Sequence, residues 1–253
     1  MTPKALEAFC LLADVVIVAL LLNGLRIALQ RTDSTALVRA AWVIAGTLLA
    51  WNVLSFQLAT HGIFVARRVA FYAPHTAAAK PLRIVLAVFP PILFAVLLPV
   101  VIGLWLILRS KAMARIVDAM PLSWLVGVQI YRVAGAIFLV LWGAGQLPWQ
   151  FAIPAGSGDV LVGLAAIPVA WAASQGSKAS STAAYAWNLL GIADFVVALG
   201  TGFLTSPSRF QMLALDHPNL LVSRFPLVMI PAFMVPLSSI MHGICLWKLH
   251  RIA

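Results

Sequence analysis

The chain has 253 residues, of which 63% are hydrophobic and only 9% are charged, and its mean hydropathy is +1.02. A soluble domain carries about a quarter charged residues, so this composition excludes a soluble globular protein. The net charge of +10 comes from short clusters of Lys and Arg between apolar segments, which is typical of residues at lipid headgroups and argues against nucleic acid as a partner.

Apolar segments long enough to cross a bilayer recur along the chain. Because about 20 helical residues span the hydrocarbon core, the sequence predicts a single transmembrane domain, residues 1–253, of the all-α class: a polytopic bundle of seven helices. The first segment is longer than the apolar core of a signal peptide, and we expect it to be retained. The predicted helices are 7–28, 37–58, 84–108, 121–144, 158–174, 184–204 and 226–247.

Two of the predicted connections are long. Residues 59–83 contain an amphipathic stretch, 63–72, in which Arg67 and Arg68 stand among aromatic and aliphatic side chains. This pattern favours an interfacial helix lying on the headgroups. Residues 205–225 are semi-apolar and interrupted by proline, and we expect them to lie at the same side of the membrane.

The distribution of Lys and Arg predicts the orientation. With the N-terminus outside, nine basic residues face the cytoplasm and seven the outside, which favours a cell-membrane protein with a cytoplasmic C-terminus. The inner residues are then Arg26, Arg31, Arg39, Arg109, Lys111, Arg115, Lys178, Lys248 and Arg251, and the outer ones Lys4, Arg67, Arg68, Lys80, Arg83, Arg209 and Arg224.

Five polar residues lie inside predicted helices and point to a functional cluster. A charge at mid-bilayer costs at least ~2.5–3.5 kcal/mol unless it is paired or hydrated. In the favoured orientation all five fall between the middle of the membrane and its outer side. We expect them to form a ligand or proton site: Asp14, Asn52, Arg132, Asp159 and Asp194.

Arg132 is the most informative of the five. It lies about eleven residues into its predicted helix, and because a guanidinium keeps its proton it requires a carboxylate or an anionic ligand. Asp194 has the closest estimated depth and is the expected partner, before Asp159 or Asp14. Two interpretations remain open, a substrate or proton site and a structural ion pair that holds two helices together.

Asp159 and Asn188 support the same site less directly. Asp159 follows Gly156-Ser157-Gly158 at the start of the predicted helix 158–174, where it could act as an N-terminal cap or attract a cation or proton. Asn188 lies beside the helical stripe that contains Asp194, on the face expected to contact protein.

The predicted seventh helix contains two internal prolines. Pro231 and Pro236 remove backbone hydrogen bonds and would free the carbonyls of Leu227 and Ala232. His242 follows and is the one histidine deep within a predicted helix. The segment is either a kinked packing helix or a hinge that lines a ligand site.

A metal site has weaker support. We expect the outer-face histidines His61, His75 and His217, with Asp216, to be interfacial, because loops of this length have no fixed ligand geometry. A metal is therefore not expected, and the sequence does not determine whether a cofactor binds. It contains no HExxH, Walker A or GxSxG motif.

The leading functional hypothesis is a small-solute or proton-coupled carrier, or a ligand-binding bundle, with the seventh helix as its moving element. An intramembrane enzyme that uses Asp159 or Asp194 as a base on a lipid-like substrate is one alternative. A structural or sensory membrane subunit is another. The expected partners are the lipid bilayer and a small molecule or proton, and an oligomer is compatible with a chain of this size.

Overall fold

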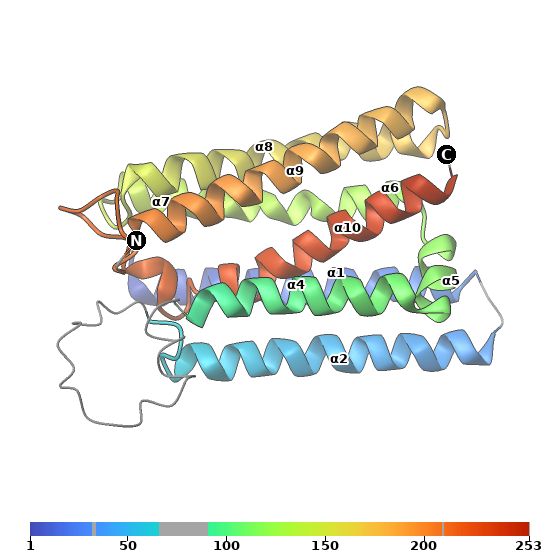
Figure 1. The fold of residues 1–253 in the computed structure, drawn as a ribbon, viewed down its shortest axis with the longest axis horizontal. Coiled ribbons are helices and arrows are strands. Elements are labelled where there is room, and N and C mark those ends of the chain that lie inside the picture. The colour runs from blue at the N-terminus through green and yellow to red at the C-terminus, as the bar shows by residue number, and fades with distance from the viewer. Residues whose placement is uncertain (32–33, 66–90, 209, 253) are drawn as a thin grey trace.

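The regular structure of the chain is helical. The computed structural model describes residues 1–31, 34–65, 91–208 and 210–252, and this part of the chain contains no strand. The longer elements run beside one another as a bundle (Figure 1). The α-helices are α1 (Pro3–Leu29), α2 (Thr35–Thr60), α4 (Pro91–Arg109), α5 (Lys111–Ala119), α6 (Leu122–Gly127), α7 (Ala136–Gly143), α8 (Trp149–Ser174), α9 (Lys178–Thr205) and α10 (Val235–Ile252).

Three elements depart from α-helical geometry. Two are 3-10 helices, η1 (Val128–Gly135) and η2 (Leu221–Ser223), and the third is a π-helix, η3 (Ile230–Met234). The segment η1 joins α6 to α7, so that Leu122–Gly143 forms one continuous span, and η3 leads directly into α10.

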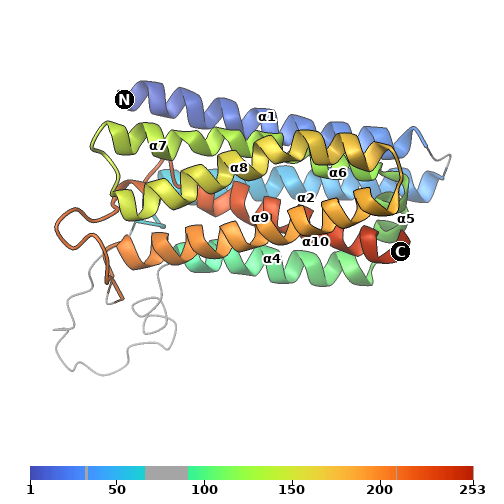
Figure 2. The ribbon, with the colours of Figure 1, turned by 90° about the horizontal axis from the view of Figure 1, so that it is seen from above.

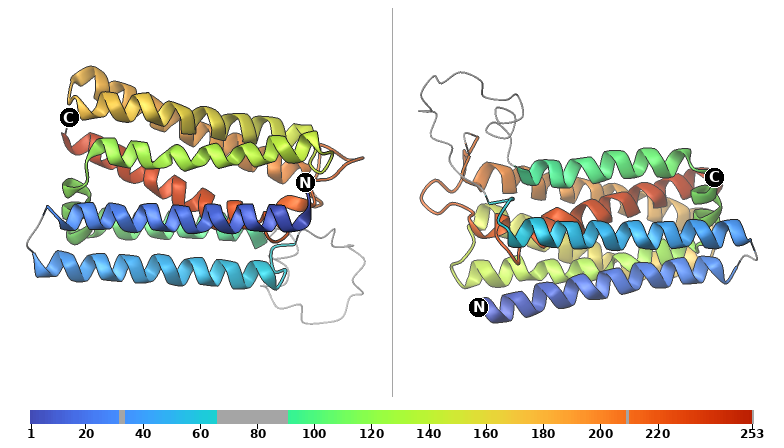
Figure 3. Two further views of the ribbon diagram at one scale, coloured as in Figure 1. Left: turned by 180° about the vertical axis from the view of Figure 1, so that it is seen from behind. Right: turned by 90° about the horizontal axis from the view of Figure 1, so that it is seen from below.

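Seven helices of the described chain are long and apolar enough to cross a membrane, which confirms the predicted all-α bundle. They are α1, α2, α4, Leu122–Gly143, α8, α9 and Ile230–Ile252. An odd number of passes places the chain termini at opposite ends of the bundle, as the two views in Figure 3 show.

Local sequence signals start and stop these helices. The hydroxyls of Thr2, Ser110 and Ser177 accept hydrogen bonds from the N–H groups of the first turns of α1, α5 and α9, which satisfies donors that have no partner inside the helix. After α7 and α8 the chain turns through Gly145 and Gly176 with φ near +67° and +68°, a conformation that favours glycine.

Several predicted boundaries differ from the structure. The helix predicted from residue 158 begins nine residues earlier, at Trp149, because Pro154 lies inside α8 and does not end the apolar segment. The last span begins at Ile230 rather than 226. The interfacial helix predicted in 59–83 and the start of the helix predicted at 84 fall largely on residues 66–90, outside the described chain.

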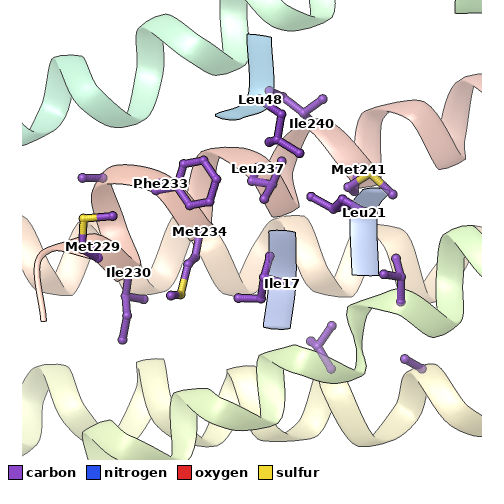
Figure 4. Packing of buried hydrophobic residues seen from close by; sticks show 14 of the residues in the cluster. Ile17, Leu21, Leu48, Met229, Ile230, Phe233, Met234, Leu237, Ile240 and Met241 are labelled. Atoms are coloured by element: carbon purple, nitrogen blue, oxygen red, sulfur yellow. The ribbon is translucent and has the colours of Figure 1, made fainter. Parts of the chain in front are cut away.

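α10 lies at the centre of the packing. It contacts α4, α5, α6 and α9, and its span is the most buried of the seven. Figure 4 shows Ile240 of α10 lying close to Leu48 of α2, and Met241 of α10 close to Leu21 of α1.

The outward faces of the peripheral helices are apolar. Trp42 and Val43 of α2 and Val101 and Trp105 of α4 are all exposed. α2 forms one edge of the bundle in Figure 1, and α4 forms one edge in Figure 2. Contiguous apolar surface of this kind is rare on proteins in water and suits contact with lipid chains.

Candidate functional site

Arg132 lies in the middle of the fourth span, within η1. This 3-10 segment is eight residues long, whereas runs longer than three or four residues are uncommon and a 3-10 stretch inside a helix often marks a functional position. The residue is 3% exposed. Its guanidinium is therefore held in the protein interior by a locally distorted helix.

Each nitrogen of this guanidinium has a partner. Nε donates to Oδ1 of Asp159 at 2.9 Å, Nη2 donates to Oδ2 of Asp194, and Nη1 donates to Nε2 of His242 at 3.0 Å. The ring of Phe195 covers one face, with its centroid 4.0 Å from Cζ. Arg132 thereby joins η1 to α8, α9 and α10. The sequence predicted one carboxylate partner for it, and the structure shows two.

The partners of His242 define its tautomer. Arginine can only donate, so Nε2 of His242 accepts and Nδ1 carries the proton, which it donates to Oδ1 of Asn188 at 2.9 Å. Nδ2 of Asn188 donates to the carbonyl of Ala184 at 2.7 Å and to Sγ of Cys245 at 3.1 Å, which fixes the orientation of the amide. The imidazole is therefore neutral in this arrangement.

Two glycines allow these side chains to come together. A Cβ at Gly158 would overlap the carboxylate of Asp194, and one at Gly191 would overlap the ring of His242. These side chains form a hydrogen-bonded network, the Arg132 network: Arg132, Asp159, Asp194, His242 and Asn188. The absence of a side chain at each glycine is thus a steric requirement of this network.

The formal charges of the network do not balance. One guanidinium contributes +1, the carboxylates of Asp159 and Asp194 contribute −2 when both are ionised, and His242 is neutral, which leaves −1. Oδ2 of Asp159 and Oδ1 of Asp194 make no hydrogen bond to the described residues. An excess charge away from water is costly unless a counter-ion or proton neutralises it.

Two cavities meet at Asp159. The smaller, about 30 Å³, is also lined by Arg132, Tyr131 and Ser238, and it exceeds the ~10–15 Å³ that one water needs. The larger, about 90 Å³, is mostly apolar and extends along Phe151, Phe203 and Ser206. Residues of both linings include Asp159, Phe195, Ile230 and Val235.

Residues of the π-helix η3 line both cavities. Pro231 and the neighbouring Ile230 belong to this five-residue segment, and π-helical turns are frequent at functional sites. The carbonyl of Leu227, which the prolines were expected to free, accepts the N–H of Ile230 at 3.1 Å, so that part of the prediction is wrong. The irregular backbone instead reshapes a cavity wall.

A second set of polar groups lies beside Arg132 and was not included in the predicted site. The hydroxyls of Tyr131 and Ser238 share a hydrogen bond, and Nε2 of Gln129 donates to the carbonyl of Ser238 at 3.2 Å. Oε1 of Gln129 is buried and has no hydrogen-bond partner among the residues that the structure describes. Two features of the sequence could have indicated these groups. Tyr131 is next to Arg132, and Ser238 lies four residues, about one helical turn, before His242.

Asp14 and Asn52 form a separate pair. Nδ2 of Asn52 donates to both carboxylate oxygens of Asp14, at 2.9 and 2.8 Å, and so links α2 to α1. Asp14 has no hydrogen bond or ion pair with Arg132 in the structure. The predicted group of five residues is therefore divided into two sites, and the larger one also contains His242 and Asn188.

The expected capping role of Asp159 is wrong. The residue lies ten positions after the first residue of α8, Trp149, and Pro148 precedes the helix at the cap position. Its carboxylate is bonded to Arg132 instead. The glycines that precede it belong to the helix and do not form a turn.

The proposed outer-face metal ligands are not assembled in the part of the chain that the structure describes. Nδ1 of His61 donates to the carbonyl of Gln57 at 2.7 Å, while Asp216 and His217 are exposed in the loop after α9. His75 lies outside the described residues. No group of three potential metal ligands occurs within the described ranges.

Comparison with known proteins gives one match. A family model described as a domain of unknown function (DUF8737) matches residues 87–250, more than half of the chain. These residues contain the whole Arg132 network and exclude the Asp14–Asn52 pair. None of the curated proteins and none of the solved structures matches the chain.

Proposed function

The chain belongs to the family described as a domain of unknown function (DUF8737), and from the site within its matched residues we propose a cell-membrane carrier that binds a small solute in exchange for a proton. The observation that carries this proposal is the charge imbalance at Arg132. Two carboxylates face one guanidinium and a neutral imidazole, so one proton completes a neutral cluster.

Asp159 is the proposed exchange group. Its side chain is 14% exposed, against 7% for that of Asp194, and it lines both cavities. Water in the smaller cavity would bring a proton to the free oxygen of Asp159, while Oδ1 stays bonded to Arg132. Asp194 then remains the permanent counter-ion of the guanidinium.

The last span suits the role of the moving element. Its first half contains η3 and Pro236, where the regular hydrogen-bond pattern is interrupted. Its last turns are held by Lys248, whose ammonium donates to the carbonyls of Val117, Asp118 and Met120 at 2.8, 3.0 and 2.5 Å. Movement would then be confined to the half that lines the cavities.

The proposed orientation places the end that contains α5 and the C-terminus in the cytoplasm. Nine Lys and Arg residues were assigned to that side against seven for the other, in the sense of the positive-inside rule. The cavities at Asp159 would then lie on the outer half of the protein.

Infrared spectroscopy of the full chain in lipid vesicles tests the proton site. We expect a carbonyl band from a protonated carboxylic acid that disappears as pH rises and is lost in Asp159→Asn. The matched control is Asp118→Asn, which removes a carboxylate paired with Arg251 at the exposed end of α5 and should leave the band unchanged. A wild-type protein without any such band between pH 5 and pH 8 would contradict the proposal.

A further inference from the structure

We infer that the solute is a short-chain organic ammonium ion, bound in the larger cavity with its nitrogen at the carboxylate of Asp159. This inference rests on the proposed function and names the class of substrate for that site. It follows from three properties of the cavity, which are its charge, the chemistry of its walls and its volume.

The charge of the lining selects a monovalent cation. Among the described residues that line the larger cavity, Asp159 is the charged one, whereas Arg132 lines the smaller cavity. An anion would make the net charge of the network more negative, from −1 to −2, and a neutral solute would leave the excess negative charge in place. One positive charge cancels it.

The walls select an organic cation over a metal ion. Calcium and magnesium require six or more oxygen ligands, but the cavity offers the Asp159 carboxylate together with the polar residues Ser206 and Ser223. The remaining lining is aliphatic or aromatic, with four phenylalanine rings: Phe138, Phe151, Phe195 and Phe203. Aromatic rings attract ammonium groups, and the apolar walls suit an alkyl body.

The volume limits that body to a few carbon atoms. A protein cavity of about 150 Å³ accommodates benzene, and the cavity at Asp159 is about 90 Å³. Each buried methylene should raise affinity about fourfold until the chain exceeds the cavity. We therefore expect affinity to increase from methylammonium to propylammonium and to fall again for hexylammonium.

The ammonium and the proton compete for the same carboxylate. When an alkylammonium ion binds to protonated Asp159, the O–H bond of the carboxylic acid breaks, the proton leaves to solvent, and the carboxylate pairs with the ammonium nitrogen. Charge is conserved because one cation replaces another. Binding should therefore release close to one proton per ammonium where the carboxyl is protonated, and it should tighten as pH rises.

Calorimetric titration of the full chain in lipid nanodiscs with propylammonium chloride tests this inference. We expect binding that neither propanol nor propionate reproduces at equal ionic strength, and that Asp159→Asn weakens at least about tenfold. Asp118→Asn is again the matched control, with unchanged affinity. Equal binding of propanol, or full binding by a folded Asp159→Asn, would overturn the inference.

A second variant covers the case in which Asp159→Asn does not fold. Gly202 lines the cavity, and a Cβ there would lie 3.4 Å from the ring of Phe151, an ordinary contact distance. Gly202→Ala should therefore fold, fill part of the cavity and weaken propylammonium binding without changing any charge. Unchanged affinity in this variant would remove the larger cavity as the binding site.

The two proposals fail in different ways. If the protonated carboxyl band is present but propylammonium does not bind, the substrate class is wrong and the proton site stands. If propylammonium binds but no protonated carboxyl exists, the ammonium site stands and proton exchange is wrong.

Discussion

Arg132 and His242 are joined by a hydrogen bond of 3.0 Å from Nη1 to Nε2, which determines the nitrogen of the imidazole that carries the proton. The two residues are 110 positions apart in the chain, and the bond connects the distorted segment of the fourth span to the centre of the last one. It also leaves Arg132 as the single positive charge of the network, so that the two carboxylates outnumber it.

The first prediction concerns this arginine. Arg132→Ala should lower the free energy of unfolding by about 3–5 kcal/mol, because it leaves buried carboxylates without their partner. Thermal denaturation of the purified protein measures the loss. The control is Arg251→Ala, which breaks an ion pair whose side chains are 40% and 42% exposed and should cost no more than about 1 kcal/mol.

The role of the carboxylates can be separated by combining substitutions. Asp194→Ala alone should be less destabilising than Arg132→Ala, because Asp159 still pairs with the guanidinium. The double variant should recover part of the loss caused by Arg132→Ala, because one of the two carboxylates left without a partner is removed. Additive losses from the two single changes would show that the pair does not act as a unit.

The tautomer of His242 is a separate prediction. Nitrogen-15 NMR of histidine-labelled protein should show one imidazole in the neutral form protonated at Nδ1, unchanged between pH 5 and pH 8. The resonance should be assigned by its loss in His242→Gln. A His242 signal that becomes doubly protonated in this range would contradict the hydrogen bonds to Arg132 and Asn188.

Lys248 should protect α5 from local opening. Its ammonium donates to three carbonyls at the end of this helix, and Lys248→Met removes the donors while retaining most of the side-chain volume. We expect faster amide hydrogen exchange in Lys111–Ala119, measured by mass spectrometry. Lys178→Met, at the exposed start of α9, should leave that exchange unchanged.

The orientation is testable by cysteine labelling in intact cells. A cysteine at the exposed Asp216 should react with a membrane-impermeant reagent from outside, and one at the exposed Ser177 should not. The native Cys10 and Cys245 are both buried, so background labelling should be low. Reaction at Ser177 alone would reverse the proposed orientation.

The sequence by itself determined the number and approximate positions of the helices that are long and apolar enough to cross a membrane. Segment length and hydropathy suffice for this, because a helix must cover the hydrocarbon core with apolar side chains. It also determined that Arg132 requires a carboxylate, since a guanidinium that keeps its proton cannot lie unpaired in a low-dielectric interior. Both conclusions depend on a residue's own chemistry and its depth along one helix.

Only the tertiary structure decided which polar residues meet. Depth says nothing about the direction in which a side chain points around its helix, and this direction is set by packing against neighbouring helices. Asp14 therefore pairs with Asn52 instead of joining Arg132. Asp159, expected as a cap, reaches Arg132 because α8 begins earlier and continues through Pro154. The cavities at Asp159 are likewise lined by residues of η1, η3, α8 and α9, segments that only the packing of the bundle brings together.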